Sequence, residues 1–225
     1  MPTTDEMTTR TATRVALQSV AEHVLSAALH AATGRIGLRR TPGGFGTPVF
    51  DRDGQPTQIV VDGTELEVRI GDQRRRAPLT TLRAAGELAG IEPGAPVDVY
   101  TPATPLVLDA VLAVDRAQAQ VLADWFALVD DALEGLRREA ADQDPAITQL
   151  WPEHFDLATT IDEVNYGGSP GDEAHDLPYL YVGPWKPPPT DAFWNEPFGA
   201  SCSSAHVVTV HDALAFFQRG RELLP

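Results

Sequence analysis

Residues 150–185 read LWPEHFDLATTIDEVNYGGSPGDEAHDLPYLYVGPW, and this stretch holds two of the six His, three of the four Tyr and two of the four Trp. Apolar, aromatic and β-branched residues favour an extended chain over about 150–161 and again over about 179–182. Between them, residues 165–176 are rich in Gly and Pro, which are typical of turns. The stretch therefore predicts two strands joined by a tight, turn-rich loop.

Helices are predicted on both sides of this stretch. Apolar residues recur at helical spacing over about 9–33, and Gly34 is a natural stop for that helix. A long central helix is predicted over about 115–141, with Asp115 as a suitable N-cap. Thr209 can cap a C-terminal helix in the same way.

The remaining segments predict a mostly antiparallel sheet. Asp53-Gly54 and Asp62-Gly63 are dipeptides favoured in tight hairpins, and another short strand is predicted at about 206–210. No repeat or domain boundary interrupts the order of elements. The sequence therefore predicts an α+β fold with a mostly antiparallel sheet, forming a single domain over 9–225 after a disordered tail of residues 1–8.

Composition and charge argue against several functions. The chain has 225 residues, is 43% hydrophobic and carries a net charge of −15, which fits an acidic soluble protein with its own core. Charge of this sign, spread along the chain, repels phosphate backbones, so no nucleic-acid partner is predicted. The longest apolar stretch, about 106–114, is interrupted by Asp109 and is too short for a membrane span, so no membrane partner is predicted.

Localisation and cofactors follow from motifs that the sequence lacks. The N-terminal segment MPTTDEMTTR has no secretory signal, and the single Cys202 fits a reducing compartment, so a cytoplasmic protein is predicted. The sequence contains no nucleotide-binding glycine motif, no H-E-x-x-H helix and no Cys pair. No cofactor and no metal ligand set are therefore predicted from motifs, and the oligomeric state stays open.

Alternation along the two predicted strands suggests a binding site. On a strand over 150–161, His154 and Asp156 share the face opposite the large apolar residues, as a plausible acid/base pair. On the second strand, Tyr179, Tyr181 and Trp185 share one face and offer an aromatic stacking surface. With Tyr166 from the intervening loop, these six residues are the predicted ligand-binding set for a possible small-molecule ligand.

Three functions stay open on this basis. The first is a small-molecule-binding protein whose aromatic pocket is built from residues 150–185. The second is a metal-assisted enzyme, whose candidate residues cluster around the glycine-rich loop: His154, Asp156, Asp172 and His175. The third is a protein that acts by association, because the segment 185–198 combines aromatic residues with prolines in an irregular stretch.

Several short motifs resemble a known family. They include Trp-Pro-x-x-Phe-Asp-Leu-Ala at 151–158, Gly-x-Ser-Pro-Gly-Asp at 167–172, Pro-Tyr-x-Tyr-Val at 178–182 and Ala-Phe-Trp-x-Glu at 192–196. The chain resembles, over nearly its whole length, a mainly actinobacterial family known only as a domain of unknown function. In the first half, TPGGFGTPVF stands where members of that family are richer in Trp and His. The resemblance implies a single domain and no particular activity.

Overall fold

A continuous helical run over 4–33 opens the chain in the computed structural model, which describes residues 3–224. It consists of α1 (Thr4–Val20), a π-helical turn η1 (Ala21–Ser26) and α2 (Ala27–Thr33). Thr3 and Glu6 form a reciprocal capping box, so the predicted tail is helical from Thr4, while residues 1–2 lie outside the described residues. Gly34 ends the run in a left-handed conformation, as predicted.

The chain folds into two compact units, where the sequence predicts a single domain over 9–225. Unit 1 comprises Met1–Asp124 and Leu150–Phe155, and unit 2 comprises Trp125–Gln149 and Asp156–Pro225. Both units contain helices and an antiparallel sheet, so the predicted α+β class is confirmed. Each unit is described separately below.

Unit 1 contains a six-stranded sheet beside the N-terminal helices. Its strands are β1 (Arg39–Thr41), β2 (Gly44–Gly46), β3 (Phe50–Arg52), β4 (Gln55–Asp62), β5 (Glu65–Ile70) and β6 (Gln73–Pro78). They follow the order β1-β2-β4-β5-β6, with β3 also paired to β4. Asp53 and Gly54 both have positive φ, as a two-residue hairpin turn between β3 and β4 requires. The short helix α3 (Leu82–Ala89) follows, and residues 91–115 form no helix or strand.

The π-helical turn fastens this irregular segment to the N-terminal helix. Glu22 is fully buried and accepts hydrogen bonds from the backbone N–H groups of Ala103 (2.6 Å) and Thr104 (2.9 Å), and from the Thr104 hydroxyl. The neighbouring His23 accepts from the Ala95 N–H at Nδ1, and its carbonyl accepts from the Gly94 N–H. Its Nε2 therefore carries the proton that it donates to the Thr104 carbonyl at 3.0 Å.

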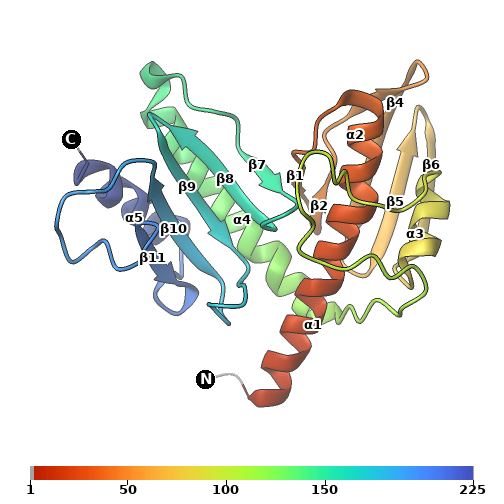
Figure 1. Cartoon of the computed structure of the whole chain (residues 1–225), viewed down its shortest axis with the longest axis horizontal. Coiled ribbons are helices and arrows are strands. Elements are labelled where there is room, and N and C mark those ends of the chain that lie inside the picture. The colour runs from red at the N-terminus through yellow and green to blue at the C-terminus, as the bar shows by residue number, and fades with distance from the viewer. Residues whose placement is uncertain (1–2, 225) are drawn as a thin grey trace. The chain divides into compact units, whose positions relative to one another are not determined.

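Unit 2 combines the rest of the chain into a sheet with helices. The elements of this part of the chain are α4 (Arg116–Glu139), η2 (Ala141–Gln143), β7 (Gln149–Trp151), β8 (Asp156–Ile161), β9 (Val164–Ser169), β10 (Tyr179–Pro184), β11 (Ala200–Ser203), η3 (Ser204–His206) and α5 (Val210–Glu222). The division between the two units falls within α4 and again within β7. Strands β11, β10, β9 and β8 lie side by side in that order, all antiparallel (Figure 1). The long central helix and the C-terminal helix are thus confirmed.

Three predictions in this region, for two strands and one loop, are wrong. The strand predicted over 150–161 is interrupted, because residues 152–155 form a turn in which Phe155 has a φ of 53°. The turn-rich loop predicted between the two strands contains β9, which includes Gly167 and Gly168. The strand predicted at 206–210 lies instead at β11, and residues 206–209 lead into α5.

Helices α4 and α5 cover one face of the unit 2 sheet. Their approach is close at two glycines: a Cβ on Gly168 of β9 would lie 2.5 Å from Val129 of α4, and one on Gly220 of α5 would lie 2.9 Å from Val182 of β10. The buried core between these layers contains Phe126, Val129, Leu133, Leu136, Leu157, Ile161, Tyr166, Leu180, Val182 and Phe217. This core leaves the opposite face of the sheet to polar and aromatic side chains.

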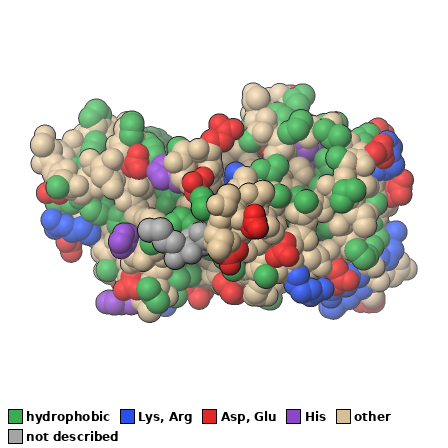
Figure 2. All heavy atoms as spheres, turned by 90° about the horizontal axis from the view of Figure 1, so that it is seen from below, with side chains coloured by type: hydrophobic (Ala, Val, Ile, Leu, Met, Phe, Trp, Pro, Cys, Tyr) green, Lys and Arg blue, Asp and Glu red, His purple; other side chains and the backbone are tan. Residues whose placement is uncertain are grey.

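Acidic side chains are distributed over the face of the molecule seen in Figure 2, with no single acidic patch there. Among residues 3–224, no helix combines the length and the apolar composition that crossing a membrane requires.

Candidate functional site

Tyr179 and Tyr181 of β10 lie on the face of the unit 2 sheet that α4 and α5 do not cover. They are opposite Ser169 and Gly167 of β9 in the strand register. The Tyr179 hydroxyl donates to Asp172 Oδ2, and the Tyr181 hydroxyl donates to Asp156 Oδ2 on β8. Burial raises the pKa of the Tyr181 phenol well above its ordinary value, and the Asp156 charge raises it further. Both phenols therefore act as protonated donors to carboxylates.

Gly167 makes the contact between Tyr181 and Asp156 possible. Strands β8 and β10 are not neighbours, because β9 lies between them. A Cβ on Gly167 would lie 2.5 Å from the hydroxyl oxygen and ring carbon of Tyr181 and 2.6 Å from the Leu157 carbonyl oxygen. Since glycine leaves this space empty, the Tyr181 ring lies across β9 and reaches a carboxylate two strands away.

The other predicted ligand-binding residues do not join this face. His154 lies exposed in the turn 152–155 of unit 1, so it does not share a strand face with Asp156, and that prediction is wrong. Trp185 follows the end of β10, is 64% exposed and donates from Nε1 to Asn165 Oδ1 at 3.2 Å. Tyr166 lies on the opposite, helix-covered face, edge-on to Phe217 at 6.1 Å between ring centroids.

The association hypothesis rests on the segment 185–198, which is only partly exposed. Trp185 and Phe198 are 64% and 44% exposed. Phe193 packs against Phe216 of α5 at 5.1 Å between ring centroids, and Trp194 packs edge-on against Phe193 at 4.9 Å. A role in association stays a prediction, and Trp185 and Phe198 are the residues available for it.

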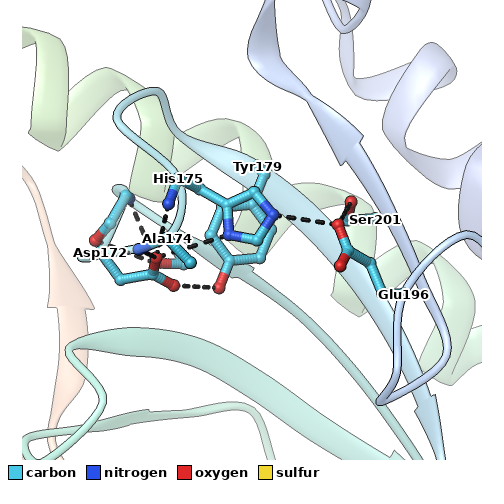
Figure 3. Close-up of polar contacts among 8 residues, drawn as sticks. Asp172, Ala174, His175, Tyr179, Glu196 and Ser201 are labelled. Carbon is cyan, nitrogen blue, oxygen red and sulfur yellow. Dashed lines mark hydrogen bonds and ion pairs between the residues drawn. The ribbon is translucent and has the colours of Figure 1, made fainter.

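A second polar cluster surrounds His175, on the loop between β9 and β10 (Figure 3). The imidazole lies between two carboxylates, with Nε2 3.0 Å from Glu196 Oε1 and Nδ1 3.4 Å from Asp172 Oδ1. Its ring lies 4.3 Å from that of Tyr179 between centroids. Ser201 of β11 donates from Oγ to the same Glu196 oxygen at 2.8 Å. The cluster thus ties the β9–β10 loop to the segment that precedes β11.

The charges in this cluster favour an imidazolium. Partial burial disfavours the charged form of His175, but the Glu196 hydrogen bond and the Asp172 charge outweigh it, so the pKa of His175 is raised. The His175 hydrogen bond lowers the pKa of Glu196, and the Ser201 hydroxyl lowers it further. A carboxylate lies near each ring nitrogen, within hydrogen-bond distance of Nε2 and 3.4 Å from Nδ1, and whenever the ring is protonated it has no lone pair to offer a metal or a substrate. The arrangement is that of a clamp between two loops.

The predicted metal-assisted enzyme gains no support from this geometry. Of its four candidate residues, the structure brings together Asp172 and His175, while Asp156 bonds to Tyr181 and His154 lies in a turn of unit 1. Within the described range 3–224, no group of three or more His, Cys, Asp or Glu side chains is arranged to hold a metal ion.

The pKa of His175 can be measured by NMR titration of its ring protons. We expect a value above the ordinary 6.5, and Glu196→Gln is expected to lower it towards 6.5. Glu173→Gln, a change at an exposed loop position, serves as the control and is expected to leave the pKa unchanged. A pKa at or below 6.5 in the unchanged protein would contradict the clamp.

The stability that the clamp adds is expected to depend on pH in both directions. A raised His175 pKa stabilises the fold fully below 6.5, and this part is lost as pH rises through the raised value. The lowered pKa values of Asp172 and Glu196 stabilise it above their ordinary 3.8 and 4.5, and this part is lost as pH falls through the lowered values. The clamp is therefore firmest between pH 4.5 and 6.5.

A cavity lies elsewhere in unit 2, where the β8–β9 turn, the end of β10 and the last turns of α5 meet. Its volume is about 310 Å³. Its walls are formed by Gln143, Ile161, Asp162, Glu163, Val164, Tyr166, Pro184, Lys186, Pro187, Arg221 and Leu224. Among the six predicted ligand-binding residues, only Tyr166 lines this cavity, and the sequence analysis missed the charged residues beside it.

The β8–β9 turn gives the cavity two acidic residues. Ile161 and Val164 pair across the hairpin, so Asp162 and Glu163 form a two-residue turn, with φ of 47° and 61°. Lys186 donates to the Glu163 carboxylate, and the Trp185 N–H donates to the Glu163 carbonyl at 2.9 Å. The turn and the segment after β10 are therefore fixed to each other at the rim.

Two donors in the cavity have no protein partner within residues 3–224. The Tyr166 hydroxyl and the Arg221 guanidinium take part in none of the hydrogen bonds or ion pairs of that part of the chain. Burial raises the pKa of Tyr166 to about 12, so its hydroxyl is a donor at neutral pH.

The Asp162-Glu163 turn could have been predicted from its place between two apolar runs. No local pattern marks Arg221, since a lone arginine near a helix end is commonplace.

Comparison with known proteins adds no relative. No family model, no curated protein and no solved structure matches the chain. The resemblance to an actinobacterial family of unknown function stays a prediction.

Proposed function

We propose that unit 2 binds a small organic molecule in the cavity at the end of its sheet. The observation that carries this proposal is a cavity of about 310 Å³ that holds two donors, Tyr166 and Arg221, without a partner among residues 3–224. Small-molecule sites are typically apolar hollows of about 300–1,000 Å³ in which a few polar groups fix the orientation of the ligand. This cavity lies at the lower end of that range, which suits a molecule of metabolite size.

The lining supports binding over covalent chemistry. The apolar part of the wall consists of Ile161, Val164, Pro184, Pro187 and Leu224. The lining contains no Ser, Thr, Cys or His nucleophile, and its two carboxylates, Asp162 and Glu163, lie in the solvent-exposed β8–β9 turn. The hydrogen bond to Glu163 raises the pKa of Lys186, which keeps its amine protonated and therefore poorly nucleophilic.

A blocked cavity provides the test of this function. Pro187 is exposed and lines the cavity, so Pro187→Trp fills part of the space without disturbing the core. A metabolite panel is screened for thermal stabilisation, and each hit is measured by calorimetry on the unchanged and the altered protein. We expect at least one hit that Pro187→Trp weakens about tenfold or more, which corresponds to about 1.4 kcal/mol.

Pro189→Trp is the matched control, because Pro189 is exposed and lies outside the cavity wall. It is expected to leave the affinity unchanged. Hits that bind equally well to Pro187→Trp and Pro189→Trp would show that binding takes place elsewhere. A broad panel without any hit would remove the proposal.

A further inference from the structure

The four charged side chains of the cavity fall into two groups. Lys186 and Glu163 form an ion pair with each other at the rim of the cavity. Arg221 and Asp162 form no ion pair with any residue from 3 to 224. The cavity is therefore neutral as a whole, yet it presents one unpaired positive charge and one unpaired negative charge.

Both unpaired charges lie near the Tyr166 hydroxyl. The positive charge of Arg221 lowers the pKa of that phenol, and the negative charge of Asp162 raises it, in addition to the larger effect of burial. Tyr166 is 1% exposed and is fixed by its edge-on contact with Phe217. The phenol therefore has a fixed position in the cavity, and the charges of Arg221 and Asp162 are close enough to affect its pKa.

We infer that the ligand is a small zwitterion with an apolar body, and that the class which fits is a free α-amino acid with an apolar side chain. The carboxylate is held by Arg221 with the Tyr166 hydroxyl, and the ammonium group is held by Asp162. The apolar side chain lies against the wall of Ile161, Val164, Pro184, Pro187 and Leu224. This inference rests on the proposed function, and it names the class of ligand for the same cavity.

Other charge types fit the lining less well. A simple carboxylate would pair with Arg221 but would bring a second negative charge towards Asp162. A simple amine would pair with Asp162 but would approach Arg221 with a like charge. A zwitterion pairs with both residues and leaves the cavity neutral, although Asp162 is exposed and Arg221 only half-buried, so each charge is also in contact with solvent when the cavity is empty.

The volume limits the side chain as well. A cavity of about 310 Å³ accommodates an amino acid with a branched or aromatic side chain but excludes a folded peptide. The apolar residues of the wall favour a leucine or phenylalanine side chain over a serine hydroxyl, and the charges of Glu163 and Lys186 already pair with each other, so they offer less to the charged side chain of aspartate or lysine. We expect leucine and phenylalanine to bind more tightly than these three.

The test uses four probes in calorimetric titrations of the full chain. They are L-leucine, L-phenylalanine, N-acetyl-L-leucine, which has only the carboxylate, and L-leucinamide, which has only the ammonium group. We expect leucine or phenylalanine to bind, and both blocked derivatives of leucine to bind about tenfold or more weakly than leucine.

Two variants test which residue binds each charge of the ligand, and a third is the control. Arg221→Gln is expected to weaken leucine about tenfold or more, whereas Arg219→Gln is the control, since Arg219 is exposed, pairs with Glu222 and lies outside the cavity. Asp162→Asn is expected to weaken leucine but not N-acetyl-leucine. Asparagine tolerates the positive φ of this turn position, so the substitution removes the charge and preserves the backbone.

The outcomes separate this inference from the proposed function. N-acetyl-leucine or leucinamide binding as tightly as leucine would overturn the zwitterion and leave the cavity as a binding site. The same holds if no amino acid binds while another ligand binds in a way that Pro187→Trp blocks. If neither the amino acids nor the metabolite panel bind, both the inference and the proposed function fail.

Discussion

Gly167→Ala is expected to destabilise unit 2 by about 2–3 kcal/mol, because overpacking a filled region costs about that much. The new Cβ would lie 2.6 Å from the Leu157 carbonyl oxygen, which is backbone and cannot move away by a change of rotamer. It would also lie 2.5 Å from Tyr181, whose ring would have to leave the surface of β9. The Tyr181–Asp156 hydrogen bond would be lost with that movement.

Thermal unfolding followed by circular dichroism measures the effect, with an expected fall in melting temperature of about 4–12 °C. Gly135→Ala on α4 is the matched control, because a Cβ there would meet Leu214 at an ordinary 3.4 Å. That change is expected to be neutral or slightly stabilising, since alanine favours helix over glycine. Equal melting temperatures for the two variants would refute the packing role of Gly167.

Glu22→Gln is expected to destabilise unit 1 by about 2–3 kcal/mol, because it weakens a buried, charge-assisted set of hydrogen bonds. The carboxylate accepts from two backbone N–H groups, of Ala103 and Thr104, and from the Thr104 hydroxyl. Glutamine keeps the shape of the side chain but turns one acceptor into a donor. That donor would face a buried N–H or hydroxyl group that then has no acceptor.

Hydrogen exchange of the backbone amides localises this effect. We expect the amides of Ala103 and Thr104 to exchange faster in Glu22→Gln, and the segment 91–115 to become sensitive to protease, because Glu22 anchors it to the N-terminal helix. Glu87→Gln, at an exposed position of α3, is the control and is expected to change stability by less than about 0.5 kcal/mol. Unchanged exchange at Ala103 and Thr104 would show that the anchor lies elsewhere.

Elements with strong periodicity or clear caps could be predicted from the sequence. The apolar stripe of the central helix, which includes Phe126, Val129 and Leu133, is buried as its spacing requires. Asp53-Gly54 forms the expected hairpin turn, and Tyr179 and Tyr181 do share one face of a strand. These features depend on residues close in sequence, where local rules hold.

The features that could not be predicted depend on contacts between segments that are distant in sequence. Strand β9 was hidden because Gly167 and Gly168 are typical of loops, whereas here they give Tyr181 and Val129 room to approach opposite faces of the strand. The turn 152–155 breaks the alternation on which the pairing of His154 with Asp156 depended. The cavity joins residues from four segments between Gln143 and Leu224, so only tertiary structure brings them together.

The turn formed by Asp162 and Glu163 has a strained backbone, and the same two residues line the cavity. Left-handed backbone at both positions suits Asn-Gly far better than a pair of acids, and a glutamate there is strained by about 1 kcal/mol or more. A chain selected only for resistance to heat would drift towards Asn-Gly at this hairpin. Such a protein would have a higher melting temperature. It would lack the Glu163 carboxylate, which pairs with Lys186, and the Asp162 carboxylate, which lines the cavity. Under the proposed function, thermal stability and ligand binding would therefore place opposite demands on residues 162 and 163.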